Sequence, residues 1–154
     1  MTAAAVAAFI HHLAAFSLVA ALVVEAVLVT NGLTLRSARV VQRADMVLGG
    51  AAVVLLLAGL ARVMHYEKGW AYYSSSVPFI AKFSLFVLVA LLSLYPTIVF
   101  LSWRRPLRLG EALAGNDDRL RSVRLLIYLE LVGVVAIILC AALMAKGIGS
   151  WMPS

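Results

Sequence analysis

The sequence predicts an all-α integral membrane protein, a four-helix bundle that forms one domain over residues 1–154. Hydrophobic residues make up 64% of the chain and charged residues only 13%, whereas a soluble domain of this length needs more charge to cover its surface. Four apolar runs each hold the roughly 20 residues that span a bilayer, and none alternates as a β-strand does. We expect the helices at 3–31, 46–67, 77–103 and 120–146.

The basic residues predict how these helices are oriented. The other side of the membrane holds only Arg62, Lys68, Lys82 and Lys146, whereas the first and third loops hold nine arginines: Arg36, Arg39, Arg43, Arg104, Arg105, Arg108, Arg119, Arg121 and Arg124. By the positive-inside rule the two arginine-rich loops lie in the cytoplasm. Both termini then lie outside a bacterial inner (cytoplasmic) membrane. The net charge of +6 follows from this bias and does not indicate nucleic-acid binding.

The first expected helix carries two histidines and a glutamate. It lacks the basic start of a cleavable signal peptide, so we expect it to remain as a span. His11 and Glu25 are 14 residues apart, which puts them within about 40° of each other on a helix. A carboxylate in a membrane helix faces the bundle interior. We therefore expect His11 to point inward and His12 toward lipid; the alternative is that both are interfacial.

The second expected helix begins after Asp45, a residue well suited to an N-cap. Near its other end Arg62 and His65 lie about 60° apart around the helix axis, so they face a similar direction. A stripe of small residues, typical of close helix packing, runs between these points: Gly49, Ala52 and Gly59.

The segment 62–82 forms a hydrophilic cap that joins the second and third helices. Serines followed by Pro78 predict a helix start, whose free N–H groups favour an anion. We expect an acidic ligand, a lipid phosphate or a haem propionate among them, to be bound by Arg62, Tyr66, Lys68 and Lys82. The aromatic residues of the cap suit a membrane-interface belt equally well.

A second polar layer is expected deeper in the bundle. Glu25 near the end of the first helix and Glu130 near the start of the fourth lie at a similar depth, with Asp45 at the edge of the layer. Two adjacent carboxylates in a low dielectric cannot both ionise, so the pair is expected to hold a proton or a cation. Glu25 and Glu130 are thus candidates for a proton relay. Ser93 and Thr97 are expected in the same layer. The alternative is that each carboxyl separately accepts a hydrogen bond from a neighbour or reaches toward a loop arginine.

The cap also suits haem b. A haem in a helix bundle needs one or two axial His or Met ligands from facing helices, and cations for its propionates. His11 and His65 lie on consecutive antiparallel helices and are the expected iron ligands. The second ligand stays open between His65, His12 and Met144. A zinc or copper site lacks a Cys or carboxylate partner at ligand spacing.

The chain resembles a bacterial family of small predicted membrane proteins of unassigned function. The matching features run along most of the chain: His11, Glu25, Asp45 with Gly49, Arg62, Lys68-Gly69 with Tyr73, Pro78-Phe79 with Lys82, and Ser93 with Pro96-Thr97. It is more remotely similar to the HemJ-type protoporphyrinogen oxidases, through the His-bearing stretch 9–13 and through Lys82. That similarity implies haem binding and oxidation of a porphyrin-type substrate.

Three functions follow as hypotheses. The first is a haem b protein with a redox or electron-transfer role, a membrane oxidoreductase if it is an enzyme, with quinone or a porphyrin as its small-molecule partner. The second is a proton- or cation-coupled transporter or channel that uses Glu25 and Glu130 and works as a homo-oligomer. The third is a non-enzymatic membrane subunit, whose polar layers only hold the helices together.

Overall fold

Four long helices make up most of the protein in a computed structural model, which describes residues 2–66, 77–110 and 117–146. They are α1 (Ala3–Thr30), α2 (Leu35–Ala61), α4 (Val77–Ser102) and α6 (Asp117–Ala145). A short π-helix, η1 (Arg62–Tyr66), continues α2, and a short helix, α5 (Arg104–Leu109), follows α4. The all-α prediction is confirmed.

Local capping explains where the first two helices begin. The Thr2 hydroxyl accepts a hydrogen bond from the Ala5 backbone N–H at 3.4 Å, which caps α1. Thr34 and Ser37 form a capping box, in which each side chain accepts from the backbone N–H of the other residue. Such a box satisfies N–H groups that the first helical turn leaves unpaired. It starts α2 at Leu35.

The predicted start of the second helix at residue 46 is therefore wrong. The residues between the capping box and Asp45 hold no proline or glycine, so nothing interrupts the helix between Leu35 and Asp45. Asp45 is not an N-cap. It lies inside α2 and is buried.

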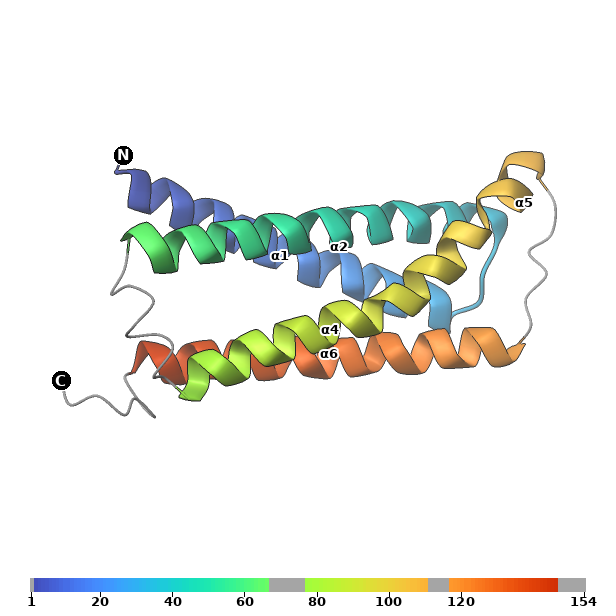
Figure 1. The fold of residues 1–154 in the computed structure, drawn as a ribbon. Coiled ribbons are helices and arrows are strands. Elements are labelled where there is room, and N and C mark those ends of the chain that lie inside the picture. Colours follow the sequence, from blue (N-terminus) through green and yellow to red (C-terminus); the bar gives the residue numbers. More distant parts are fainter. Residues whose placement is uncertain (1, 67–76, 111–116, 147–154) are drawn as a thin grey trace.

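The helices associate as two antiparallel pairs. Figure 1 shows α1 running beside α2, and α4 beside α6. Contacts between α1 and α6 and between α2 and α4 join the pairs into one bundle. All four helices are long and apolar enough to cross a membrane.

The two ends of the bundle are packed differently. At the arginine-rich end, where the nine arginines named above lie, two side chains of α2 tie this helix to the chain around α5. Arg39 donates to the Leu107 carbonyl at 3.0 Å, and Gln42 donates to the Phe100 carbonyl at 2.6 Å. The core nearby includes the fully buried side chains of Val41 from α2, Phe100 from α4, and Val123 and Ile127 from α6. The two cavities described below lie farther from this end.

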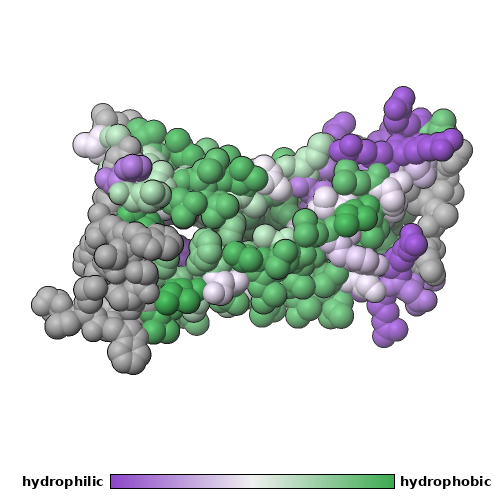
Figure 2. Space-filling model, viewed as in Figure 1, coloured by the Kyte–Doolittle hydropathy of each residue, from purple (hydrophilic) through white to green (hydrophobic). Residues whose placement is uncertain are grey.

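The surface has the pattern of a membrane protein. In Figure 2 the body of the bundle is hydrophobic, and hydrophilic residues gather at the arginine-rich end. Large apolar side chains face outward along all four long helices; Phe16, Leu57, Ile98 and Val132 are each more than half exposed. A lipid bilayer around the four spans covers this surface.

Candidate functional site

Three acidic side chains are buried in the interior, and we refer to Glu25, Asp45 and Glu130 as the carboxyl cluster. They come from α1, α2 and α6, and their exposed fractions are 1%, 7% and 1%. Glu25 lies close enough to Asp45 and Glu130 for their charges to act on it. The prediction that Glu25 faces the bundle interior is confirmed.

Hydroxyl groups of α4 complete this polar layer. The Thr97 hydroxyl donates a hydrogen bond to Asp45 Oδ1 at 2.6 Å. The Ser93 side chain interacts with the Glu130 carboxyl. Even so, one oxygen of Glu25 and one of Glu130, Oε1 in each case, have no hydrogen-bond partner among the residues that the structure describes. Buried polar atoms are seldom left this way, and each exception needs an explanation.

No metal-binding group is found around this cluster in the part of the chain that the structure describes. Across residues 2–66, 77–110 and 117–146, no group of three His, Cys, Asp or Glu side chains is arranged to hold a metal ion. Calcium, for example, takes six or more oxygen ligands that converge on one point. The carboxyls share a layer without sharing such a point.

A partly open cavity of about 110 Å³, the carboxyl cavity, lies beside this layer. Apolar side chains of all four long helices form most of its wall, and Ser93 and Glu130 supply polar groups. Glu130 therefore borders a space whose wall is almost wholly apolar.

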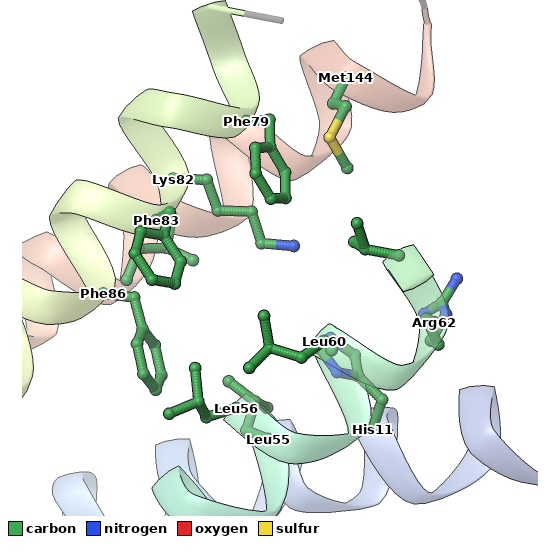
Figure 3. Close-up of a pocket in the computed structure, with 13 residues that line it drawn as sticks. His11, Leu55, Leu56, Leu60, Arg62, Phe79, Lys82, Phe83, Phe86 and Met144 are labelled. Atoms are coloured by element: carbon green, nitrogen blue, oxygen red, sulfur yellow. The ribbon is translucent and has the colours of Figure 1, made fainter. Parts of the chain in front are cut away.

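A second cavity of about 120 Å³, the histidine cavity, lies toward the opposite end of the bundle (Figure 3). His11 borders it from α1 and Lys82 from α4, and Lys82 extends toward α2. Arg62, the first residue of the π-helix, lies at its edge. π-helical turns often mark functional sites, and this one was not predicted from the sequence.

Gly59 explains how the His11 ring fits against α2. A Cβ built on Gly59 would lie 3.4 Å from His11 Cε1 and 3.6 Å from Nδ1. The ring thus occupies the space that a larger side chain would fill. It interacts with the backbone carbonyl of Leu55, while Nδ1 is buried and lacks a partner in the described part of the chain.

The two cavities are neighbours. Leu55, Phe86 and Ile137 border both of them, so these three side chains form the partition between the cavities. The cavities therefore follow one another along the bundle, from the histidine at one end to the carboxyl cluster.

The structure brings together some of the predicted site residues and separates others. His11, Arg62, Lys82 and Met144 all line the histidine cavity. His65 is exposed and does not line it. His12 is exposed on the outer side of α1, with Nδ1 2.6 Å from the Ala8 carbonyl oxygen. The side chain of Tyr66, and all of Lys68, lie outside the described residues.

Haem b binding stays a prediction from the sequence, and the histidine cavity, which is partly open, is small for a porphyrin. An engineered cavity of about 150 Å³ holds a single benzene ring, and the histidine cavity is about 120 Å³. A porphyrin is several times larger than one ring. His65, the expected partner of His11 on the iron, does not face this space.

The apolar residues of the histidine cavity were not predicted from the sequence. Phe79, Phe83 and Phe86 line the histidine cavity from one face of α4. They recur at spacings of four and three residues, which places them on one side of a helix, so their spacing was a readable signal.

The model of a family described as "Predicted membrane protein (DUF2214)" matches residues 3–149. No curated protein and no solved structure matches the chain. The remote similarity to HemJ-type oxidases is not shown by these comparisons.

Proposed function

The chain belongs to the family of predicted membrane proteins DUF2214, and we propose that it passes protons across the bilayer through its carboxyl cluster. Ionisable side chains within membrane helices are costly, and they commonly mark proton relays and ion pathways. This chain has Glu25, Asp45 and Glu130 on three helices at one level of the bundle interior.

One observation carries the proposal: Glu25 and Glu130 are each 1% exposed, and each has an oxygen atom without a hydrogen-bond partner in the described residues. A carboxyl whose only role is to hold helices together would be expected to pair both oxygens. Three carboxyls in a low dielectric do not all ionise together. The cluster can therefore accept a proton at one oxygen and release it from another.

Protons are favoured over metal cations by the number of ligands that each requires. A dehydrated cation needs several oxygens around one point, and the described residues offer no such group of three. A single carboxyl holds a proton by itself.

Proton flux into liposomes tests the proposal. The purified protein is reconstituted around a pH-sensitive dye, and a potassium gradient with valinomycin drives proton entry. We expect flux with the natural sequence and a loss of at least tenfold in Glu25→Gln and in Glu130→Gln, because an amide of the same shape cannot carry the proton. A sodium gradient applied without a proton gradient should produce no comparable sodium flux.

The control is Asp117→Asn, which removes an exposed carboxyl at the start of α6. It should conduct as the natural sequence does. Folding of each variant is checked by size-exclusion chromatography and helical circular dichroism. Flux that survives in both glutamine variants, or that is absent from the well-folded natural protein, contradicts the proposal.

The orientation of the bundle is part of the same proposal. Nine arginines lie at the arginine-rich end, whereas Arg62, Lys82 and Lys146 lie toward the other. By the positive-inside rule this bias places the arginine-rich end in the cytoplasm and the start of α1 outside. Protons driven inward would then reach the histidine cavity before the carboxyl cluster.

Haem b binding stays a prediction from the sequence. One observation favours it, since His11 and Met144 border the same cavity and both are known types of axial ligand. The size of that cavity and the position of His65 count against it. A reduced-minus-oxidised absorption spectrum of the purified protein tests it.

A further inference from the structure

We propose that the arginines of α2 and α5 bind the head group of an anionic phospholipid, in the leaflet at the arginine-rich end of the bundle. The site, which we call the arginine cluster, consists of six residues, all of them exposed: Arg36, Arg39, Arg43, Arg104, Arg105 and Arg108. The cluster lines neither of the two cavities, and the proposal does not depend on proton passage.

A hydrogen bond between two helices brings these arginines together. The three arginines of α2 recur at intervals of three and four residues, which places them on one side of the helix. Arg39, the middle one, donates to the Leu107 carbonyl of α5 at 3.0 Å. Its neighbours Arg36 and Arg43 therefore extend from the side of α2 that meets α5.

The short helix α5 presents its own arginines at the surface. Its Leu107 side chain is buried, whereas Arg104, Arg105 and Arg108 are exposed. The two ties from α2 described above hold α2 against the chain around α5. The arginines of the two helices thus lie side by side in a fixed arrangement.

The positive charge of the cluster is not balanced by neighbouring acids in the chain. Residues 31–44 and 98–110 contain no Asp or Glu. Asp45, on which the charge of Arg104 acts, is buried inside the bundle. Like charges that lie close together repel one another, so an anion between the two helices is favoured. Guanidinium groups bind phosphate through paired hydrogen bonds, which makes a phosphate group the matching anion.

The other three arginines of this end have acids beside them. Arg119, Arg121 and Arg124 belong to α6, whose first turn contains Asp117 and Asp118. These acids precede Arg121 by four and three residues, a spacing at which opposite charges on a helix interact. In Figure 2 hydrophilic residues form one group over α5 and the beginning of α2, and a second at the beginning of α6. The α6 arginines are therefore a control for the cluster.

The position of the cluster favours a lipid over a soluble anion. It lies at the ends of apolar spans, where lipid head groups meet water. Exposed apolar side chains stand next to its arginines in the chain: Val40, Leu101 and Leu109. A lipid whose phosphate is held by the cluster can bury its acyl chains against such side chains. A free phosphate ion gains nothing from them.

Binding of two matched lipids to the detergent-purified natural protein tests this inference. Phosphatidylglycerol and phosphatidylcholine with the same acyl chains are titrated in turn, and bound lipid is counted by native mass spectrometry. We expect phosphatidylglycerol to bind at least tenfold more tightly. Inorganic phosphate at the same concentration should not displace it. Equal binding of the two lipids, or displacement by inorganic phosphate, would overturn the proposal.

Two double variants that remove the same charge locate the site. An arginine close to an anionic lipid contributes about fivefold in affinity. Arg36→Gln with Arg105→Gln should therefore weaken phosphatidylglycerol binding at least tenfold. Arg119→Gln with Arg121→Gln should change it by less than about threefold. Equal losses in the two double variants would mean that the lipid responds only to net charge, and would overturn the assignment to the cluster.

These variants are chosen to leave the fold intact. Arg36 and Arg105 are exposed, whereas Arg39 is kept because it ties α2 to α5. Each double variant should melt in lipid-free detergent within a few degrees of the natural protein. Proton flux in liposomes is a separate measurement that is sensitive to Glu25 and Glu130, so failure of the lipid site and failure of the proton route are distinguishable.

Discussion

At the scale of single residues, side chains of the same chemical type differ in burial and in hydrogen bonding. Asp45 has a short hydrogen bond from Thr97, at 2.6 Å, whereas Glu25 and Glu130 each keep an oxygen without a partner in the described residues. His11 and His12 show the same contrast, since one ring borders a cavity and the other is exposed. A substitution at exposed His12 is therefore the natural control for the same substitution at His11.

The bond from Thr97 to Asp45 should contribute measurably to stability. Thr97→Val keeps the shape of the side chain and removes the hydroxyl, which leaves Asp45 Oδ1 buried and unpaired. Such a loss costs about 1–3 kcal/mol. We expect a lower melting temperature in detergent for Thr97→Val.

Thr97→Ser, which retains the hydroxyl, is the matched control and should melt close to the natural sequence. A Thr97→Val protein as stable as the natural one would show that the Asp45 carboxyl finds another donor. The hydrogen bond would then be incidental to the fold.

At the scale of helices, the sequence predicts more about α1, α4 and α6 than about α2. The apolar runs and the positions of Glu25 and Glu130 follow from hydropathy and helical spacing. The start of α2 does not, because the run of arginines before Asp45 looks like a loop, and the capping box of Thr34 and Ser37 differs from the usual Ser/Thr…Glu pattern. The π-helix at Arg62–Tyr66 was not predicted from the sequence.

Close packing of α4 on α6 depends on Gly133. A Cβ built there would lie 2.5 Å from Val89 Cγ2, and a branched side chain cannot move aside easily. We therefore expect Gly133→Ala to destabilise the protein by about 1–3 kcal/mol through overpacking, seen as a lower melting temperature.

The double variant Gly133→Ala with Val89→Ala should recover part of that loss, since it removes the clash. Gly50→Ala is the control. No atom lies within 4 Å of a Cβ at Gly50, so alanine there should be neutral or stabilise the helix by up to about 1 kcal/mol. If Gly50→Ala and Gly133→Ala have equal effects, the close contact with Val89 is not what matters.

At the scale of the whole molecule, the packing varies from one end to the other. The arginine-rich end has the closely packed core and the ties from α2 to the chain around α5. The cavities lie farther along, bordered by residues such as Leu55, Phe86 and Ile137. Composition predicts four spans but not this difference, because it arises from which side chains meet across helices.

The sequence also predicts that two polar layers exist, but not which residues join them. His65 was expected beside His11 because both lie near one end of consecutive helices. The switch from α-helix to π-helix at Arg62 changes the direction of the side chains that follow, and His65 is exposed. Asp45 was placed at the edge of the inner layer, and the true path of α2 carries it into the cluster.

Cysteine labelling tests the orientation of the whole bundle. In a Cys140→Ser background, single cysteines replace Thr2 at the start of α1 and Arg36 at the arginine-rich end. In intact cells we expect a membrane-impermeant maleimide to label the cysteine at position 2 and not that at position 36. After the cells are opened both should react. The reverse pattern would contradict the positive-inside assignment.

The central claim is that the carboxyl cluster holds a proton inside the bilayer, and infrared spectroscopy of the reconstituted protein tests it most directly. At neutral pH we predict an absorption band of a protonated carboxyl group that shifts in deuterated water. The band should diminish in Glu25→Gln and Glu130→Gln and persist in Asp117→Asn. A natural protein without that band, or one whose band is the same in every variant, would contradict the claim.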